Sequence, residues 1–217
     1  MSFGGRWPTL VCCSDSISAD YETELRARGF RIIAGADEAG RGSLAGPLVA
    51  AAVILHLKSK PDGLRDSKKL TEKKRSGLYE SITAGCLAWS VGVVEPADID
   101  RLGIQAANML ALESAVLSLS SKPDYVAADW YKNDAFQLPW EGVRDGDSTV
   151  ASIAAASIIA KVTRDKLMVQ LAEKYPGYGF ERHKGYGSAE HLAAIVSLGP
   201  SPAHRLSYRP CSALKLL

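Results

Sequence analysis

Residues 31–57 read RIIAGADEAGRGSLAGPLVAAAVILHL and contain two short apolar runs separated by glycines. The first run, residues 31–36, predicts a strand, and Gly40 and Gly42 interrupt the segment that follows it. The second run, residues 47–57, is apolar at both odd and even positions, which is typical of a strand buried on both faces. We therefore expect the second run to be central in a sheet.

Strand and helix patterns alternate along the rest of the chain. The expected helices lie at residues 20–28, 71–83, 104–119, 149–175 and 189–197, and the further expected strands at residues 87–94 and 125–128. Gly29 is placed to end the first helix and Thr71 to cap the second. Strands with interleaved helices indicate one α/β or α+β domain with a mixed sheet. We assign residues 29–217 to this domain and residues 1–28 to an irregular N-terminal extension.

The composition is typical of a globular protein. The chain has 217 residues, of which 47% are hydrophobic and 23% charged, and this excludes a disordered or collagen-like protein. No apolar run reaches the roughly 18 residues of a membrane-spanning helix, and the N-terminus shows no signal segment. The four cysteines show no CxxC spacing, so we expect reduced thiols and no zinc site. We expect a soluble, cytoplasmic protein.

The charge is unevenly distributed along the chain. Residues 161–217 hold nine Lys and Arg against four Asp and Glu, although the formal net charge of the whole chain is only +2. A basic segment beside an acidic remainder suits a nuclease, which binds phosphates and holds cations with carboxylates. A solvent-exposed, lysine-rich helix face explains the same excess. Charge alone leaves both interpretations open.

Asp37 and Glu38 are the first candidate functional residues. They follow the first predicted strand, and adjacent carboxylates suit a hard divalent cation. Because neighbouring strand residues point to opposite faces, both acids can serve one site only if the chain turns there, which Gly40 and Gly42 permit. These glycines also allow the backbone around Arg41 to approach a phosphate or sugar closely. An ordinary Asp-Glu turn remains the alternative.

Two further carboxylates precede or follow predicted elements. Asp129 ends the strand at 125–128, where it is placed either to bind a metal ion or to start a turn. Asp147 stands just before the long helix at 149–175, where it is placed either in a site or as a helix cap. Sequence position alone leaves both alternatives open for each residue.

Two basic segments complete the candidates. Lys68 lies in the segment Arg65-Asp66-Ser67-Lys68-Lys69-Leu70, whose hydroxyl and ammonium groups precede a helix and suit a phosphate. Tyr186 lies in His183-Lys184-Gly185-Tyr186-Gly187, where a tyrosine between glycines is able to stack on a sugar or base. The alternatives are solvated lysines at a capped helix and an aromatic ring packed on the core.

Taken together, the segments resemble the type 2 ribonucleases H, the bacterial ribonuclease HII family. The matching motifs occur in the family's order over about residues 29–210, nearly the whole chain. They are Asp37-Glu38-Ala39-Gly40-Arg41-Gly42, Asp66-Ser67-Lys68-Lys69-Leu70, Asp129, Gly146-Asp147 with Ile153-Ala-Ala-Ala-Ser-Ile-Ile-Ala-Lys161-Val, and Lys184-Gly185-Tyr186-Gly187.

The resemblance implies a ribonuclease H-like α/β fold, a central mixed sheet flanked by helices, with a helical C-terminal portion. It implies an endoribonuclease that hydrolyses the RNA of RNA–DNA hybrids, nicks 5′ to single ribonucleotides in duplex DNA, and leaves 5′-phosphate and 3′-hydroxyl ends. Two divalent ions, Mg²⁺ or Mn²⁺, serve the reaction. Nucleic acid is the implied partner, and we expect a monomer.

The resemblance also assigns roles to residues. The implied catalytic and metal-binding acids are Asp37, Glu38, Asp129 and Asp147, and the implied substrate contacts are Gly40, Arg41, Gly42, Lys68 and Tyr186. The turn at residues 40–42 corresponds to the element that senses the ribose 2′-hydroxyl. Tyr186 corresponds to the residue that packs on the sugar at the RNA–DNA junction.

The sequence departs from the family pattern at two positions. Asp145 replaces a lysine two residues before the fourth acid, and Trp130 follows the third acid where glycine is common. Asp145 opens an alternative, a hybrid-binding protein with impaired catalysis, and a third hypothesis is another two-metal hydrolase such as a phosphatase. We interpret Asp165 as structural, a helix-surface partner for a nearby basic residue.

Overall fold

The computed structural model describes residues 17–129 and 136–214. The strands are β1 (Ile33–Ala39), β2 (Leu48–Ile54), β3 (Ala88–Val94), β4 (Tyr125–Asp129) and β5 (Trp140–Val143). The α-helices are α1 (Asp20–Ala27), α2 (Glu72–Gly85), α3 (Pro96–Leu102), α4 (Ile104–Leu117), α5 (Gly146–Thr149), α6 (Ala151–Lys174), α7 (Phe180–His183), α8 (Ala189–Leu198) and α9 (Cys211–Leu214). Two short 3₁₀ helices, η1 (Leu57–Ser59) and η2 (Ser67–Lys69), lie between β2 and α2.

The five strands form one mixed sheet in the order β3-β2-β1-β4-β5. β2 pairs antiparallel with both β1 and β3, whereas β1 with β4 and β4 with β5 are parallel pairs. Every residue of β2 is buried, which confirms the interior strand that its apolar run predicts. The sequence patterns miss α3 and β5, because these elements are too short to show a clear period.

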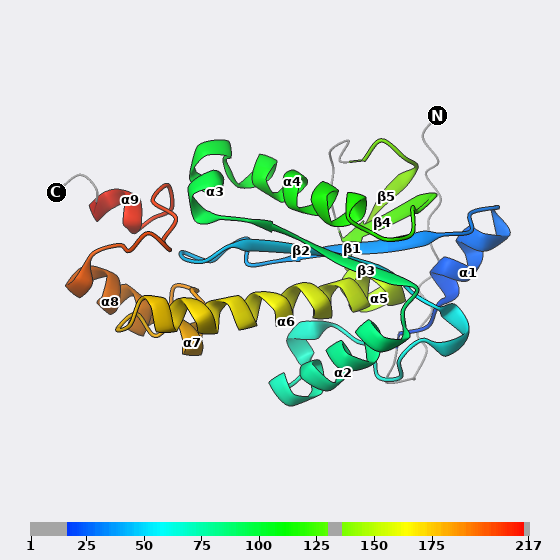
Figure 1. Ribbon diagram of the computed structural model, residues 1–217, viewed down its shortest axis with the longest axis horizontal. Helices are drawn as coiled ribbons and strands as arrows, with labels where there is room; N and C mark the ends of the chain where they lie inside the picture. The colour runs from blue at the N-terminus through cyan, green and yellow to red at the C-terminus, as the bar shows by residue number, and fades with distance from the viewer. Residues whose placement is uncertain (1–16, 130–135, 215–217) are drawn as a thin grey trace.

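Helices cover both faces of the sheet, as Figure 1 shows, with α3 and α4 on one side and α6 and α2 on the other. Alternate residues of β2 pack toward opposite layers. Leu48, Ala50 and Ala52 join the core beneath α4, whereas Ala51 and Val53 join the core against α6. A mixed sheet between two helical layers confirms the predicted α/β fold.

Helix α6 lies close to β1 because the facing residues are small. A Cβ atom at Gly35 would lie 2.1 Å from the main-chain carbonyl carbon of Ser152, so no larger residue fits there without movement. Residues 151–160 of α6 are all buried and are mostly alanine, serine and isoleucine. This close packing brings the start of α6, and α5 before it, against the strands that carry the acids.

Helix α1 confirms the short helix predicted at residues 20–28, and Gly29 follows it with φ +105°. Leu25 is completely buried and packs with Ile33 and Tyr125. The Ser152 N–H donates to Oε1 of Glu22 at 2.7 Å, so α1 contacts the start of α6. The division between an extension at 1–28 and a domain at 29–217 stays a prediction, since residues 1–16 lie outside the described residues.

The C-terminal helices gather at one end of the molecule, far from α1 (Figure 1). The chain after α8 returns to the residues that precede β2, where the Arg205 N–H donates to the Leu44 carbonyl. The Leu44 N–H donates in turn to the Gly185 carbonyl at 2.8 Å. The turn before β2 and the loop after α7 are therefore joined directly through their backbones.

Across residues 17–129 and 136–214, no helix has the length and apolar character needed to span a membrane. Cys86 and Cys211 are free thiols. Cys12 and Cys13 lie outside the described residues.

Candidate active site

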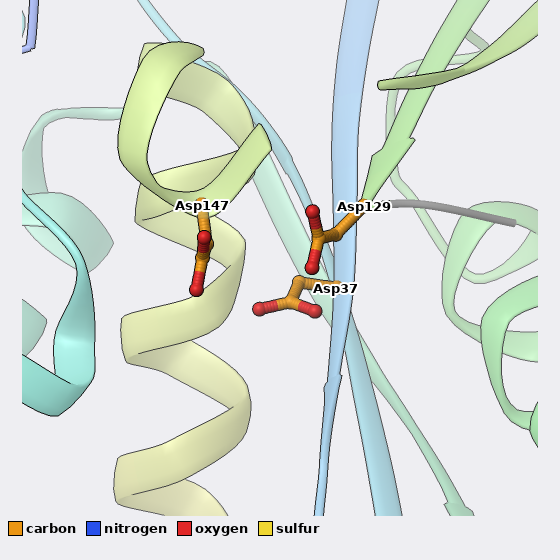
Figure 2. Close-up of side chains that lie close together, drawn as sticks. All are labelled: Asp37, Asp129 and Asp147. Atoms are coloured by element: carbon orange, nitrogen blue, oxygen red, sulfur yellow. The ribbon is translucent and has the colours of Figure 1, made fainter. Parts of the chain in front are cut away.

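Three aspartates from distant parts of the chain point toward one another beside the sheet (Figure 2). Asp37 lies in β1, Asp129 ends β4, and Asp147 lies in α5. One carboxylate oxygen of each lies within 4.8 Å of the others. In the parallel pair of β1 and β4, Ala36 is opposite Ala128, so the residues that follow them, Asp37 and Asp129, are neighbours.

Asp37 and Glu38 lie inside β1, and the prediction that they follow the strand at a turn is wrong. The strand continues through Ala39 because Glu38 and Ala39 still pair with β2. The side chains of Asp37 and Glu38 therefore point to opposite faces of the sheet. The side chain of Ser157 in α6 opposes the rise in the pKa of Asp37, whereas the side chain of Asn108 in α4 opposes the rise in the pKa of Glu38. Within the described part of the chain, Glu38 is not among the acids whose oxygens meet.

The aspartate cluster, Asp37 with Asp129 and Asp147, concentrates negative charge in a buried place. Burial raises the pKa of Asp37 well above its usual range, and the charges of Glu38 and Asp129 raise it further. Burial, followed by the charge of Asp147, also raises the pKa of Asp129. Crowded carboxylates repel each other unless a cation joins them, and carboxylate oxygens are the ligands of hard divalent ions. The cluster therefore fits a divalent metal ion.

Glu38 borders this cluster from the other face of β1. Burial raises its pKa, the positive charge of Arg41 opposes that effect, and Asp129 raises the pKa again. The Arg41 guanidinium lies 3.8 Å from Oε1 of Glu38. The side chain of Asn108 also lowers the pKa of Glu38, yet within the described residues its amide has no hydrogen bond of normal geometry.

Asp147 does not cap the long helix, so that alternative is wrong. Val150 occupies the N-cap position of α6, and the Ser152 N–H donates to Glu22 instead. Asp129 accepts a hydrogen bond from the Gly146 N–H at 2.8 Å. This contact ties the end of β4 to the helix that carries Asp147.

Lys68, in η2, contacts the aspartate cluster through Asp147. Its ammonium lies 3.0 Å from Oδ2 of Asp147, and this hydrogen bond raises the pKa of Lys68. The Ser67 and Ser157 hydroxyls lie 2.9 Å apart and fasten η2 to α6. The Lys68 side chain remains 77% exposed, so it is accessible to a phosphate as well. Thr71 caps α2, as its position predicts.

The turn at residues 40–42 and Tyr186 lie on adjoining loops. Gly40 has φ +93°, and a Cβ atom there would lie 2.0 Å from Nε of Arg164. Gly42 has open space where a Cβ would be. Tyr186 is 41% exposed, and its ring lies against Lys161 and Arg164 of α6, so both a stacking role and a ring packed on the core stay open. The hydrogen bond from Leu44 to Gly185 brings these two loops together.

Three further residues singled out in the sequence are Asp165, Asp145 and Trp130. Asp165 pairs with Lys161 at 2.7 Å, which confirms its role as the partner of a basic residue on α6. Asp145 is exposed, has φ +53°, and stands at the N-cap of α5. Trp130 lies outside the described residues.

Sequence reasoning missed two buried cations and one buried amide near the site. Arg164 and Arg205 are completely buried, as is Asn108. The helical period offers a signal for Arg164, because it follows Ala160 and precedes Met168 at four-residue spacing on the buried side of α6. Arg205 lies outside any regular element, so only the tertiary structure reveals it.

The comparisons with known proteins agree with this fold and site. The family model described as Ribonuclease HII matches residues 34–211. Ribonuclease HII of Geobacter sulfurreducens is 51% identical over 190 residues, 88% of each chain, and that of Salinispora arenicola is 48% identical over 203 residues, 93% of this chain and 76% of the relative. The crystal structure of ribonuclease H2 from Pyrococcus horikoshii OT3 superimposes with a TM-score of 0.73 and 26% identity, covering 86% of this chain and 98% of that one.

The family model spans most of the chain, two relatives exceed 45% identity over most of its length, and the solved structure shares its architecture. The three aspartates fall within the matched residues and are grouped as a metal-dependent nuclease requires. The chain therefore belongs to the ribonuclease HII family and is a ribonuclease H, an endonuclease that hydrolyses RNA in RNA–DNA hybrids.

Proposed function

We propose that this enzyme, besides hydrolysing the RNA strand of hybrids, nicks duplex DNA on the 5′ side of a single embedded ribonucleotide. The products would carry 5′-phosphate and 3′-hydroxyl ends. The observation that carries the proposal is the grouping of Asp37, Asp129 and Asp147 with oxygens within 4.8 Å of each other. The Gly40 to Gly42 turn, joined to the Tyr186 loop, supplies a means of recognising a ribose.

Four acids would hold two divalent ions, Mg²⁺ or Mn²⁺, in this proposal: Asp37, Glu38, Asp129 and Asp147. Bound there, the ions supply activation of a water molecule and stabilisation of the leaving 3′-oxygen. Glu38 enters the set from the opposite face of β1, so its carboxylate would contribute from the border of the aspartate cluster. Burial, followed by the charges of Glu38 and Asp129, raises the pKa of Asp37, and bound cations would stabilise the charged form of its carboxylate.

Other residues of the chain bind and orient the nucleic acid. Backbone groups of Gly40, Arg41 and Gly42 contact the 2′-hydroxyl, which alone separates a ribonucleotide from its DNA neighbours. Lys68 contacts a phosphate through its exposed ammonium. Tyr186 stacks its exposed ring on the sugar at the RNA–DNA junction. The protein works as a monomer, and residues 29–217 form the catalytic domain.

The alternative, a hybrid-binding protein inactivated by Asp145, has less support. Asp145 is exposed and, within the described residues, is not among the acids whose oxygens meet. Its φ of +53° is one that aspartate tolerates better than most residues. Asp145 therefore suits this backbone position, and its side chain, which makes no capping hydrogen bond to α5, leaves the aspartate cluster intact.

The test uses a DNA duplex with one ribonucleotide beside an all-DNA duplex, each with Mg²⁺ and with EDTA. We expect a Mg²⁺-dependent nick 5′ to the ribonucleotide and an intact all-DNA duplex. Binding without cleavage would favour the hybrid-binding alternative. In that case Asp145→Lys should create activity, whereas under our proposal it only adjusts an existing rate. Cleavage that ignores the 2′-hydroxyl would favour a general two-metal hydrolase.

A further inference from the structure

Arg164 is a completely buried arginine in the middle of α6. Its guanidinium donates three hydrogen bonds to main-chain carbonyls, from Nε to Pro47 at 3.0 Å, from Nη1 to Lys184 at 3.0 Å and from Nη2 to Ala45 at 3.1 Å. Burying a charge is costly unless it is well paired. The three hydrogen bonds to these carbonyls offset part of that cost.

The three acceptors belong to two segments that are far apart in sequence. Ala45 and Pro47 follow the Gly40 to Gly42 turn, whereas Lys184 directly precedes Gly185 and Tyr186. Lys184 also has φ +52°, a backbone conformation that non-glycine residues rarely adopt. One planar guanidinium therefore fixes the end of the turn and the start of the tyrosine loop relative to each other.

Arg164 contacts the turn and the tyrosine directly as well. A Cβ atom at Gly40 would lie 2.0 Å from Nε of Arg164, so the turn packs its backbone against the guanidinium. The guanidinium carbon lies 5.4 Å from the centroid of the Tyr186 ring, within the range of a cation–π contact. The ring thus has a fixed support on one side while 41% of the residue is exposed.

We propose that Arg164 is a positioning residue for ribose recognition, which holds the Tyr186 ring at a fixed place beside the Gly40 to Gly42 turn. The proposal rests on the proposed function of these two elements. A lysine cannot replace it, because one ammonium does not match three carbonyls in the plane of a fork. The role requires no contact between Arg164 and the substrate.

Arg205 provides a matched comparison. It is also completely buried and also donates to main-chain carbonyls, those of Gly46 and Arg41. Its guanidinium lies over the ring of Tyr208. Arg205→Lys therefore disturbs a buried guanidinium beside the same turn without removing the support beneath Tyr186.

The test is a double-mutant cycle on kcat/KM with Arg164→Lys, Tyr186→Ala and the double variant. The substrate is the duplex with one ribonucleotide. If the wild-type enzyme cleaves only a uniform RNA–DNA hybrid, the proposed function fails, and the cycle is then measured on that hybrid. The two failures are therefore distinguished. We expect each single change to lower kcat/KM by about 5-fold to 150-fold, the range of one lost stacking contact. The double variant should be no slower than Tyr186→Ala.

By contrast, Arg205→Lys and Tyr186→Ala should act independently, so that their fold reductions in kcat/KM multiply in the double variant. Multiplying effects of Arg164→Lys and Tyr186→Ala would overturn the proposal, because a merely structural role acts independently of the ring. Coupling of equal size for Arg205→Lys would overturn it too. If Arg164→Lys does not fold, as shown by thermal melting, Arg164→Gln retains two N–H donors and enters the same cycle with the same expected outcome.

Discussion

The ammonium of Lys68 lies 3.0 Å from Oδ2 of Asp147, although the two residues are 79 positions apart in the chain. The pair joins η2, which precedes α2, to α5, the helix that carries Asp147. Lys68 is mostly exposed, whereas Asp147 is buried. The ammonium of Lys68 partly neutralises the aspartate cluster, and because its side chain is exposed it is also accessible to a phosphate.

Lys68→Gln should weaken binding of the nucleic acid. If Lys68 contacts one phosphate, the slope of log affinity against log salt should become shallower by about 1. Filter binding of an uncleaved substrate in EDTA, at several salt concentrations, measures both quantities. Lys69→Gln is the matched control, because Lys69 is its exposed neighbour and only approaches Asp66 at 3.9 Å. Equal slopes for the wild type and Lys68→Gln would remove Lys68 from the phosphate contacts.

Asp37→Asn should abolish cleavage, with a loss of at least about 100-fold, because removing one group that stabilises charge in a reaction already costs that much. Substrate binding should survive. Without metal, the variant should melt at a higher temperature than the wild type, since burial and repulsion disfavour the charged form of Asp37.

A metal titration followed by melting temperature separates this prediction from a folding defect. Mg²⁺ should raise the melting temperature of the wild type more than that of Asp37→Asn. Asp165→Asn is the control, because Asp165 pairs with Lys161 on α6, and it should keep the full response to metal. An active Asp37→Asn enzyme would refute the assignment of the site.

Tyr186→Ala should slow cleavage at a single embedded ribonucleotide by an amount equivalent to about 1–3 kcal/mol, the value of a stacking contact. Tyr186→Phe keeps the ring over which Arg164 and Lys161 lie, so it should keep most of the activity. Single-turnover rates on the same duplex compare the two variants. If Tyr186→Ala cleaves as fast as the wild type, the ring does not contact the substrate.

A buried histidine pair makes stability depend on pH. Nε2 of His191 lies 3.1 Å from Nε2 of His204, and Nδ1 of His204 accepts the Ser201 N–H. One imidazole must accept where the other donates, so protonation of both rings breaks the contact. Burial lowers the pKa of His191, and burial followed by the charge of His191 lowers the pKa of His204 to about 4.

Because the folded pKa values lie below the unfolded value, the unfolded state binds more protons as pH falls. The pair therefore contributes stability that is complete above about pH 6.5 and declines as the pH approaches about 4. Urea unfolding of metal-free protein across this range tests the prediction by comparing the wild type with His204→Gln, whose decline should be smaller. The control His56→Gln, at an exposed histidine, should follow the wild type, and parallel curves for all three would contradict the prediction.

Glu22→Ala should lower the free energy of unfolding by about 1–2 kcal/mol, because it removes the acceptor of the Ser152 N–H at the start of α6. Glu22→Gln keeps an acceptor oxygen and should cost less. Thermal and urea unfolding report the difference.

Deletion of residues 1–16 should be tolerated better than deletion of residues 1–28, which also removes the buried Leu25, and equal stability of the two truncations would show that α1 is dispensable.

Much of the fold could be predicted from local pattern. The apolar run at 47–57 identifies β2 as an interior strand, and helical spacing identifies α4 and α6. Both are predictable because the spacing of apolar residues along the chain depends directly on the type of element and on which of its faces are buried. The end of β1 was predicted wrongly. Its pairing with β2 extends the strand through the acidic residues Asp37 and Glu38, and a local pattern contains no information about a strand's neighbour.

The sequence by itself determined the fold class, the family motifs and the identity of the candidate acids, because each depends on residue type and short spacing. Only the tertiary structure decided which acids meet. Asp37, Asp129 and Asp147 share one cluster while Glu38 borders it, because strand pairing selects the face on which each side chain lies. It also decided the placement of Arg164, whose three acceptors come from two segments that approach each other only when the whole chain has folded.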